Sequence, residues 1–266
     1  MIRLLENYDD QPGAKMQKIN TIPHSSNKSA PKKAMILAAG LGTRMRPITD
    51  KIPKPLVEVA GKTLLDYGLD ALTRSGVEEA IINVHYHAEQ IEQHVANRTD
   101  IKITISDERE ELLDSGGGIA NALPLLGDDP FYLLNADSFW VEGCTQNLSR
   151  MSDGWDAQEM DIMLLLSCMK KAVGFGSKGD FSMDTDGRLL RRVEKKIAPF
   201  AYAGAAIINP SIFKGAPDGA FSLNKQFDTA LEQERLFGVR LEGLWLHVGT
   251  PDAIYEAEDA IAKSAA

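Results

Sequence analysis

The chain has 266 residues, of which 44% are apolar and 25% are charged, and its formal net charge is −9. This composition is typical of a globular protein, and no apolar run reaches the roughly 18 residues that a membrane helix needs. The negative charge argues against a nucleic-acid binder, which needs a cationic face. Cys144 and Cys168 have no CxxC partner, so neither a disulfide framework nor a zinc site is expected.

Residues 1–33 differ from the rest of the chain. They contain many Asp, Asn, Ser, Pro and Lys residues without a sustained apolar period, which predicts a flexible N-terminal arm. The apolar h-region of a secretory signal is missing there, so the expected location is the cytoplasm. Residues 34–266 are predicted to form one domain, acting as a monomer or a homodimer.

From residue 34 onward, apolar strand patterns alternate with helical patterns. The strands are predicted at 34–40, 79–86, 101–108 and 130–137, and the helices at 63–76, 87–97 and 117–126. Such alternation predicts βαβ units and a parallel sheet with helices on both faces. With right-handed crossovers, the fold class is α/β with a doubly wound, mostly parallel sheet.

Beyond Trp140 the pattern is looser. It predicts a small antiparallel lobe added to the sheet, followed by a terminal helix with Thr250 as N-cap and Pro251 at its first position. The predicted elements are a strand at 161–170, two antiparallel strands within 180–196, a strand entering a short helix at 202–213, a helix at 221–238 and one or two strands at 239–249.

The loop after the first strand is rich in glycine and is followed by basic residues. Small residues let the backbone approach a ligand, and successive amides in such a turn bind anions. Arg44 and Lys54, the latter between two prolines, add cations. Neither the dinucleotide pattern G-x-G-x-x-G nor a Walker A lysine is present. We therefore expect a triphosphate site made by Ala39, Gly40, Leu41, Gly42, Thr43 and Arg44.

The segment "LAAGLGTRMRPITDKIPKPLVEVAGKTLLDY" resembles the signature of the sugar-1-phosphate nucleotidyltransferases. The resemblance continues through "LLDSGGGIANALPLL", "FYLLNADSFW", "YAGAAIINPSIF" and "WLHVGTPDAI". Within this family the chain looks most like the N-acetylmuramate-1-phosphate uridylyltransferases of peptidoglycan recycling, with small mannose-1-phosphate guanylyltransferases as the alternative. The resemblance implies a Rossmann-like fold with a sugar-binding lobe. It also implies transfer of a nucleotidyl group from a nucleoside triphosphate, here UTP, to a sugar 1-phosphate, with release of pyrophosphate.

The resemblance also implies roles for individual residues. Arg44 would contact the departing pyrophosphate, Lys54 the α-phosphate, and Asp137, at the end of an apolar strand, Mg²⁺. The base would lie against Gly116, Gly117 and Gly118. The acceptor sugar phosphate would be held by Asn135, at the end of the strand before Asp137, and by three residues of the lobe: Glu194, Lys195 and Gly204. Lys196 stands where relatives have proline after the Glu-Lys pair.

His247 departs from the family pattern, in which an aspartate before V-G-T-P serves as the second Mg²⁺ ligand. Three interpretations stay open. His247 could bind the metal, with Mn²⁺ or Co²⁺ favoured because imidazole is a softer donor than Mg²⁺ prefers. It could instead donate to a phosphate, or Asp137 could suffice with water completing the shell. A nucleotide-binding homologue with little turnover is a further alternative that this histidine raises.

Overall fold

The computed structural model describes residues 30–264. Strand β1 (Lys33–Leu37) begins one residue before the predicted start of the domain, because the backbone of Lys32 already bonds to Glu78 and Glu79. The rest of the predicted arm, residues 1–29, lies outside the described residues.

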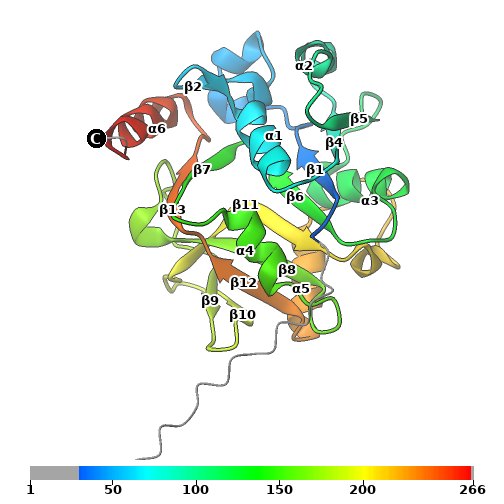
Figure 1. The fold of residues 1–266 in the computed structure, drawn as a ribbon, viewed down its shortest axis with the longest axis vertical. Coiled ribbons are helices and arrows are strands. Elements are labelled where there is room, and N and C mark those ends of the chain that lie inside the picture. Colours follow the sequence, from blue (N-terminus) through cyan, green and yellow to red (C-terminus); the bar gives the residue numbers. More distant parts are fainter. Residues whose placement is uncertain (1–29, 265–266) are drawn as a thin grey trace, which may run out of the picture.

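A nine-stranded sheet forms the centre of the molecule (Figure 1). Its first half is parallel, in the order β5 (Lys102–Asp107), β4 (Glu79–Val84), β1 and β6 (Phe131–Asn135). The second half turns antiparallel at β11 (Phe200–Ile208), which lies between β6 and β8 (Ile162–Cys168). The remaining strands are β12 (Leu236–Arg240), parallel to β8, and the antiparallel pair β9 (Phe181–Met183) and β10 (Leu189–Arg191). The parallel half and the antiparallel lobe are both as predicted.

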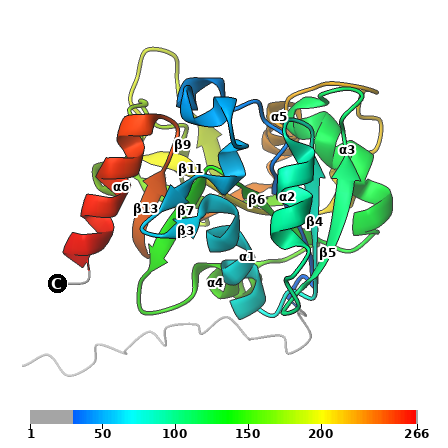
Figure 2. The same ribbon diagram turned by 90° about the horizontal axis from the view of Figure 1, so that it is seen from above.

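Helices cover both faces of the sheet. Successive side chains of β1 point to opposite faces and are buried on both, so both faces must be covered. Ile36 belongs to a buried cluster with the first group of helices, whereas Met35, on the opposite face, packs with the second group (Figure 2). The first group is α1 (Leu64–Arg74), α2 (Ala88–Val95) and α4 (Asn147–Gly154), and the second is α3 (Asp114–Leu126) and α5 (Asn224–Glu232). The doubly wound α/β fold is therefore confirmed.

A two-stranded antiparallel ribbon stands beside the sheet. It consists of β7 (Ser138–Glu142), which follows β6 directly, and β13 (Gly243–His247). Phe139 and Leu246 of this ribbon join a third buried cluster with Met45. Around them lie β2 (Glu58–Val59), β3 (Lys62–Thr63) and the terminal helix α6 (Pro251–Ser264), which starts at Pro251 as predicted. The ribbon thus ties the end of β6 to the last part of the chain.

Two regions differ from the sequence prediction. The predicted helix 221–238 ends as α5 at Glu232, and the following residues form β12, because an apolar segment from Leu236 pairs with the buried strand β8. Strand β7 and helix α4 were not predicted. Short 3-10 turns complete the structure: η1 (Thr43–Met45), η2 (Ile48–Asp50), η3 (Lys54–Leu56), η4 (Met169–Lys171) and η5 (Pro210–Phe213).

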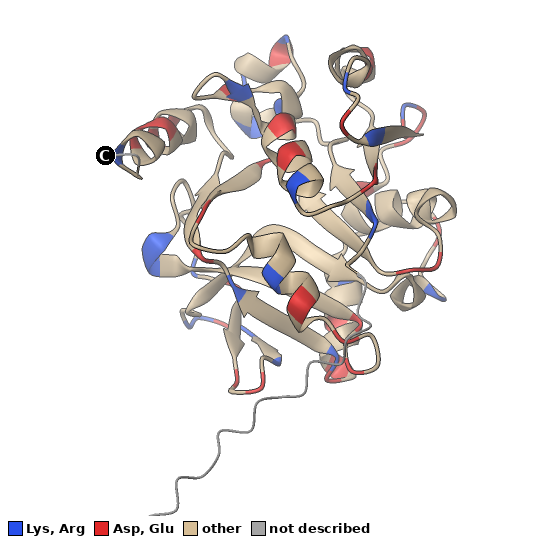
Figure 3. Cartoon of the chain, in the orientation of Figure 1, with Lys and Arg blue, Asp and Glu red and all other residues tan. Residues whose placement is uncertain are grey.

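Charge is distributed over the outer elements, with acidic residues prominent on α1 and α6 (Figure 3). Within residues 30–264, none of the helices combines the length and the apolar character required to cross a bilayer.

Candidate active site

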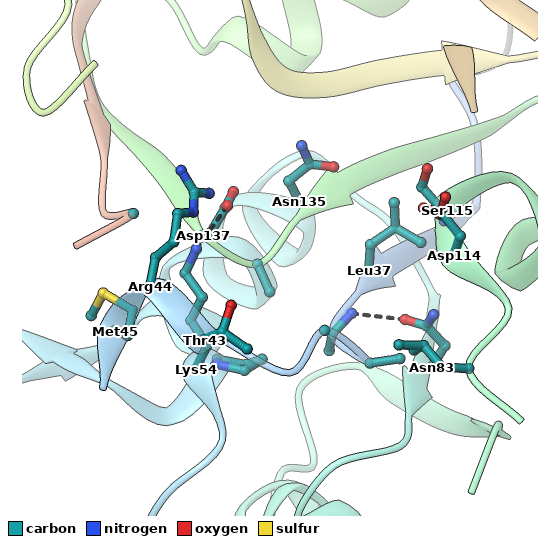
Figure 4. Close-up of a pocket in the computed structure, with 18 of the residues that line it drawn as sticks. Leu37, Thr43, Arg44, Met45, Lys54, Asn83, Asp114, Ser115, Asn135 and Asp137 are labelled. Carbon is teal, nitrogen blue, oxygen red and sulfur yellow. Dashed lines mark hydrogen bonds and ion pairs between the residues drawn. The ribbon is translucent and has the colours of Figure 1, made fainter. Parts of the chain in front are cut away.

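A cleft of about 630 Å³ opens at the carboxyl ends of β1, β4 and β6 (Figure 4). Ligands of open α/β sheets collect at this edge, where the strand order reverses. The lining includes five residues of the predicted nucleotide site, the predicted catalytic Lys54, the predicted metal ligand Asp137 and the predicted acceptor residue Asn135; the five are Ala39, Gly40, Gly42, Thr43 and Arg44. The other predicted metal ligand, His247, lies outside this lining. Leu41 is exposed and is not part of the lining. The structure therefore brings together residues that the sequence places far apart.

Gly42 fixes the course of the glycine-rich loop. Its φ is +63°, and a Cβ at this position would lie 2.9 Å from Thr49 Cγ2 and 3.1 Å from Lys54 Cβ. The hydroxyl of Thr49 donates to the carbonyl of Gly42 at 2.8 Å. Because the loop packs this closely on η2 and η3, it places Arg44 and Lys54 on the same side of the cleft.

Lys54 and Asp137 form an ion pair inside the cleft. The Nζ atom of Lys54 lies 2.9 Å from Oδ2 of Asp137, and the two side chains are only 13% and 27% exposed. Burial alone would raise the pKa of Asp137, but the charge and hydrogen bond of Lys54, together with the charge of Arg44, outweigh it and hold that pKa below its usual value. Asp137 is therefore an ionised carboxylate at neutral pH.

His247 lies next to this pair, because the ribbon places it there. It pairs with Ser138 across β7 and β13, and the amide of Val248 donates to the carbonyl of Asp137 at 2.8 Å. Its Nδ1 is 4.0 Å from Oδ1 of Asp137, which is too long for a hydrogen bond. Burial lowers the pKa of His247, and Lys54 and Arg44 lower it further while Asp137 opposes them. The imidazole is therefore neutral at pH 7.

The donor atoms at this end of the cleft fit a divalent cation. An ionised carboxylate oxygen and a neutral imidazole nitrogen face each other there. Between residues 30 and 264, no cluster of three or more His, Cys, Asp and Glu side chains is present that could enclose a metal by itself. Mg²⁺ is commonly bound by one or two protein ligands together with water and substrate phosphates. Asp137, with His247 beside it, is thus suited to a cation that phosphate helps to hold.

The other end of the cleft is polar and was missed by sequence reasoning. Asn83 accepts from the amide of Ala38 at 2.7 Å and donates to Oε1 of Glu108 at 2.8 Å. Burial raises the pKa of Glu108, although Asn83, the amide of Leu113 and His85 act in the opposite direction. Asn83 and Glu108 could have been found, because each lies at the carboxyl end of an apolar strand, the signal that singled out Asp137.

The glycines at the start of α3 pack against protein and do not line the cleft. The amides of Gly116 and Gly117 both donate to the carbonyl of Phe221, at 2.8 and 3.1 Å. A Cβ on Gly116 would lie 2.4 Å from the Phe221 ring, and one on Gly118 would lie 2.7 Å from Glu108 Oε1. Tight packing therefore explains these glycines, and their contact with a base stays a prediction. In their place, Asp114 and Ser115 line the cleft.

The predicted acceptor residues are divided between two places. Gly204, with φ +81°, sits in an irregular part of β11, where a Cβ would lie 3.2 Å from Asn135 Cβ. Asn135 lines the cleft. Glu194 and Lys195 are exposed on the loop after β10 and lie outside the lining, so their contact with an acceptor stays a prediction.

The chain is similar to known proteins in both sequence and fold. The sequence profile described as nucleotidyl transferase matches residues 33–264. The chain is 44% identical to an N-acetylmuramate alpha-1-phosphate uridylyltransferase of Caulobacter vibrioides over 88% of its own length and 99% of the relative. It is 31% identical to a mannose-1-phosphate guanylyltransferase catalytic subunit beta of Danio rerio, over 82% of this chain and 61% of the relative.

Among solved structures, a UDP-glucose pyrophosphorylase complexed with UDP-glucose superposes with a TM-score of 0.69 at 18% identity. That match covers 88% of this chain and 99% of the solved chain, and it supports the fold. Since the family profile spans almost every described residue and a relative matches nearly end to end, the chain belongs to the nucleotidyl transferase family.

Proposed function

We propose that this chain transfers a uridylyl group from UTP to N-acetylmuramate 1-phosphate, giving the UDP-sugar and pyrophosphate. The observation that carries the proposal is the cleft in which Arg44, Lys54 and Asp137 meet beside the glycine-rich loop. The choice of base and sugar rests on the 44% identical relative from Caulobacter vibrioides. We place the reaction in the cytoplasm, where nucleoside triphosphates are made, and in the recycling of cell-wall sugars.

In the proposed reaction, a phosphate oxygen of the sugar 1-phosphate attacks the α-phosphorus of the triphosphate. The new O–P bond forms as the bond from the α-phosphorus to the bridging oxygen breaks, and pyrophosphate leaves. Both reactants are anionic, so fixed cations in a partly dry cleft lower the barrier by offsetting their repulsion. Arg44 would hold the leaving pyrophosphate, and Lys54 would stabilise the charge that develops on the α-phosphate.

Asp137, with His247 as a second donor, would hold Mg²⁺ in this reaction. When bound, such a cation neutralises charge on the phosphate oxygens. Asn135, which lines the cleft, and Gly204, whose Cβ position lies 3.2 Å from Asn135 Cβ, would lie against the acceptor sugar. Asn83 and Glu108, at the opposite end of the lining, would lie near the base, because the phosphates would bind at the cationic end.

Pyrophosphate release tests the proposal. UTP, GTP, CTP and dTTP should each be combined with N-acetylmuramate 1-phosphate, mannose 1-phosphate and N-acetylglucosamine 1-phosphate. We expect the highest kcat/KM for UTP with N-acetylmuramate 1-phosphate. The 31% identity to a mannose-1-phosphate guanylyltransferase supports a second candidate, for which GTP with mannose 1-phosphate would be preferred. Nucleotide binding without pyrophosphate release for any pair would refute both.

A further inference from the structure

The predicted acceptor residues lie in two places, and a short segment before β9 joins them. On one side, the amide of Ala198, at the end of the loop that carries the Glu-Lys pair, donates to the carbonyl of Lys178 at 2.8 Å. On the other side, Oδ2 of Asp180 accepts from the amide of Tyr202 at 2.9 Å, two residues before Gly204 in β11. The segment therefore lies between the two groups of residues expected to hold the sugar phosphate.

The backbone of this segment is fixed. Gly179 has a φ of +77°, and a Cβ there would collide with the carbonyl oxygen of Ala198. Nε of Arg192 donates to the carbonyl of Gly179 at 3.0 Å, and the amide of Arg192 donates to the carbonyl of Asp180 at 2.8 Å. Close packing and hydrogen bonds thus hold the main chain of Lys178 in place before any ligand binds.

The chain that leads to Lys178 also passes along the phosphate end of the site. The amide of His247 donates to the carbonyl of Val173 at 3.0 Å, and the ring of Phe175 meets the imidazole edge-on at a centroid distance of 5.5 Å. From Val173 to Asp180, the chain therefore runs from the neighbourhood of Asp137 to the strand that carries Gly204. Lys178 stands near the second of these two ends.

The side chain of Lys178 is exposed, in contrast with its fixed backbone. Among residues 30–264, no carboxylate forms an ion pair with it. The lobe around it is basic, because residues 169–198 contain eight Lys and Arg residues against four Asp and Glu in a chain whose net charge is −9. An ammonium on a fixed backbone, in surroundings of positive charge, favours an anion.

The proposed acceptor has an anionic group besides its phosphate. N-acetylmuramate 1-phosphate carries the phosphate on C1 and the carboxylate of a lactyl ether on C3, whereas N-acetylglucosamine 1-phosphate and mannose 1-phosphate carry the phosphate alone. Because the phosphate must approach Lys54 to attack the α-phosphorus, Lys54 is committed to phosphate charge. An enzyme that distinguishes these acceptors by charge therefore needs a further cation on the acceptor side.

Resting on the proposed function, we propose that the ammonium of Lys178 binds the lactyl carboxylate of the acceptor. The enzyme thereby selects a sugar phosphate that bears a second acid group. Lys178 is then a residue that determines acceptor specificity and takes no part in the transfer step itself. Loss of one hydrogen bond between charged groups changes affinity by about tenfold or more, so the contact is strong enough to measure.

The test removes each partner of this contact in turn. Pyrophosphate release from UTP is measured with N-acetylmuramate 1-phosphate and with its lactyl carboxamide, which has a similar shape without the charge. We expect the wild type to show a kcat/KM about tenfold higher for the carboxylate, and Lys178→Gln to use both acceptors equally well. Lys178→Arg should keep the preference, because a guanidinium also pairs with a carboxylate. A preference that survives in Lys178→Gln, or that is missing in the wild type, would overturn the inference.

Arg188→Gln is the matched control. It removes one positive charge from the same lobe, from an arginine that already lies 3.7 Å from Asp186 and over the ring of Phe237. It should keep the preference for the carboxylate, and an equal loss in both variants would assign the effect to the overall charge of the lobe and overturn the inference. In each of these contrary cases, turnover of N-acetylmuramate 1-phosphate by the wild type leaves the proposed function standing. If the wild type releases no pyrophosphate with this acceptor, the proposed function and the inference both fail.

Discussion

The ammonium of Lys54 lies 2.9 Å from a carboxylate oxygen of Asp137, and both side chains face the cleft from elements that are distant in the sequence. Lys54 belongs to the turn η3 and Asp137 follows β6. The pair sets a positive charge beside the glycine-rich loop and keeps a carboxylate ionised next to it.

Lys54→Ala should lower kcat for pyrophosphate release by about 10²-fold or more, the scale of losing one preorganised donor to the transition state. The control is Lys51→Ala, which removes an exposed lysine from the same segment. Steady-state kinetics with UTP and N-acetylmuramate 1-phosphate measure both. A wild-type kcat in Lys54→Ala would show that this ammonium plays no part in the chemistry.

Gly42→Ala should lower the free energy of unfolding by about 1–3 kcal/mol, because the new Cβ meets Thr49 and Lys54 and the positive φ is strained for alanine. Gly40→Ala is a close control in the same loop. A Cβ there has nothing within 4 Å, so its stability should change little. Urea unfolding compares the two variants, and equal losses would contradict this account of the loop.

Asp70→Asn should weaken the dependence of the free energy of unfolding on pH in the acidic range. Burial would raise the pKa of Asp70, but hydrogen bonds from Lys62 and Arg98 outweigh it and lower that pKa in the folded state. Asp70 therefore contributes stability that is present above its unfolded pKa and is lost as the pH falls through the folded value.

At neutral pH we expect Asp70→Asn to cost about 1 kcal/mol, given that the side chain is partly exposed. The difference from wild type should shrink as the pH falls below about 4. Urea titrations across that range measure it, with the exposed Asp128→Asn as control. A difference that stays constant with pH would argue against this ion pair as the source.

Gly204→Ala should weaken the acceptor side of the cleft, because its Cβ would lie 2.2 Å from the hydroxyl of Ser138 and would push against Asn135. We expect a higher KM for the sugar 1-phosphate together with lower stability. Adding Ser138→Ala removes the closest contact and should recover part of both losses, while the strain of the positive φ remains. No recovery in the double variant would place the cause elsewhere.

The parallel half of the sheet was predictable because its signal is local. Alternating apolar runs and helical periods from β1 to β6 are visible within short windows, and the polar residues at the strand ends mark the cleft. The position of Asp137 at such an end follows from the same pattern.

The remaining features of the fold and of the site depend on contacts between segments that are distant in the sequence. Nothing near His247 indicates that β13 pairs with β7 rather than with the central sheet, so its place beside Asp137 could not be derived from periodicity. The boundary between α5 and β12 is set by pairing with β8. The packing of Phe221 and Gly219 on Gly116 and Gly117 could not be predicted either, because a run of glycines looks the same in the sequence whether a ligand or a protein segment packs against it.

The ribbon of β7 and β13 also has a consequence for synthesis. The cleft begins with β1 and its loop, near the start of the described chain, but Gly249, two residues after β13, reaches it from the opposite end, with His247 beside Asp137. A growing chain that has not yet released β13 from the ribosome lacks the strand that pairs with β7 beside Asp137. The active cleft is therefore assembled last, although the first strand of the sheet carries its most recognisable motif.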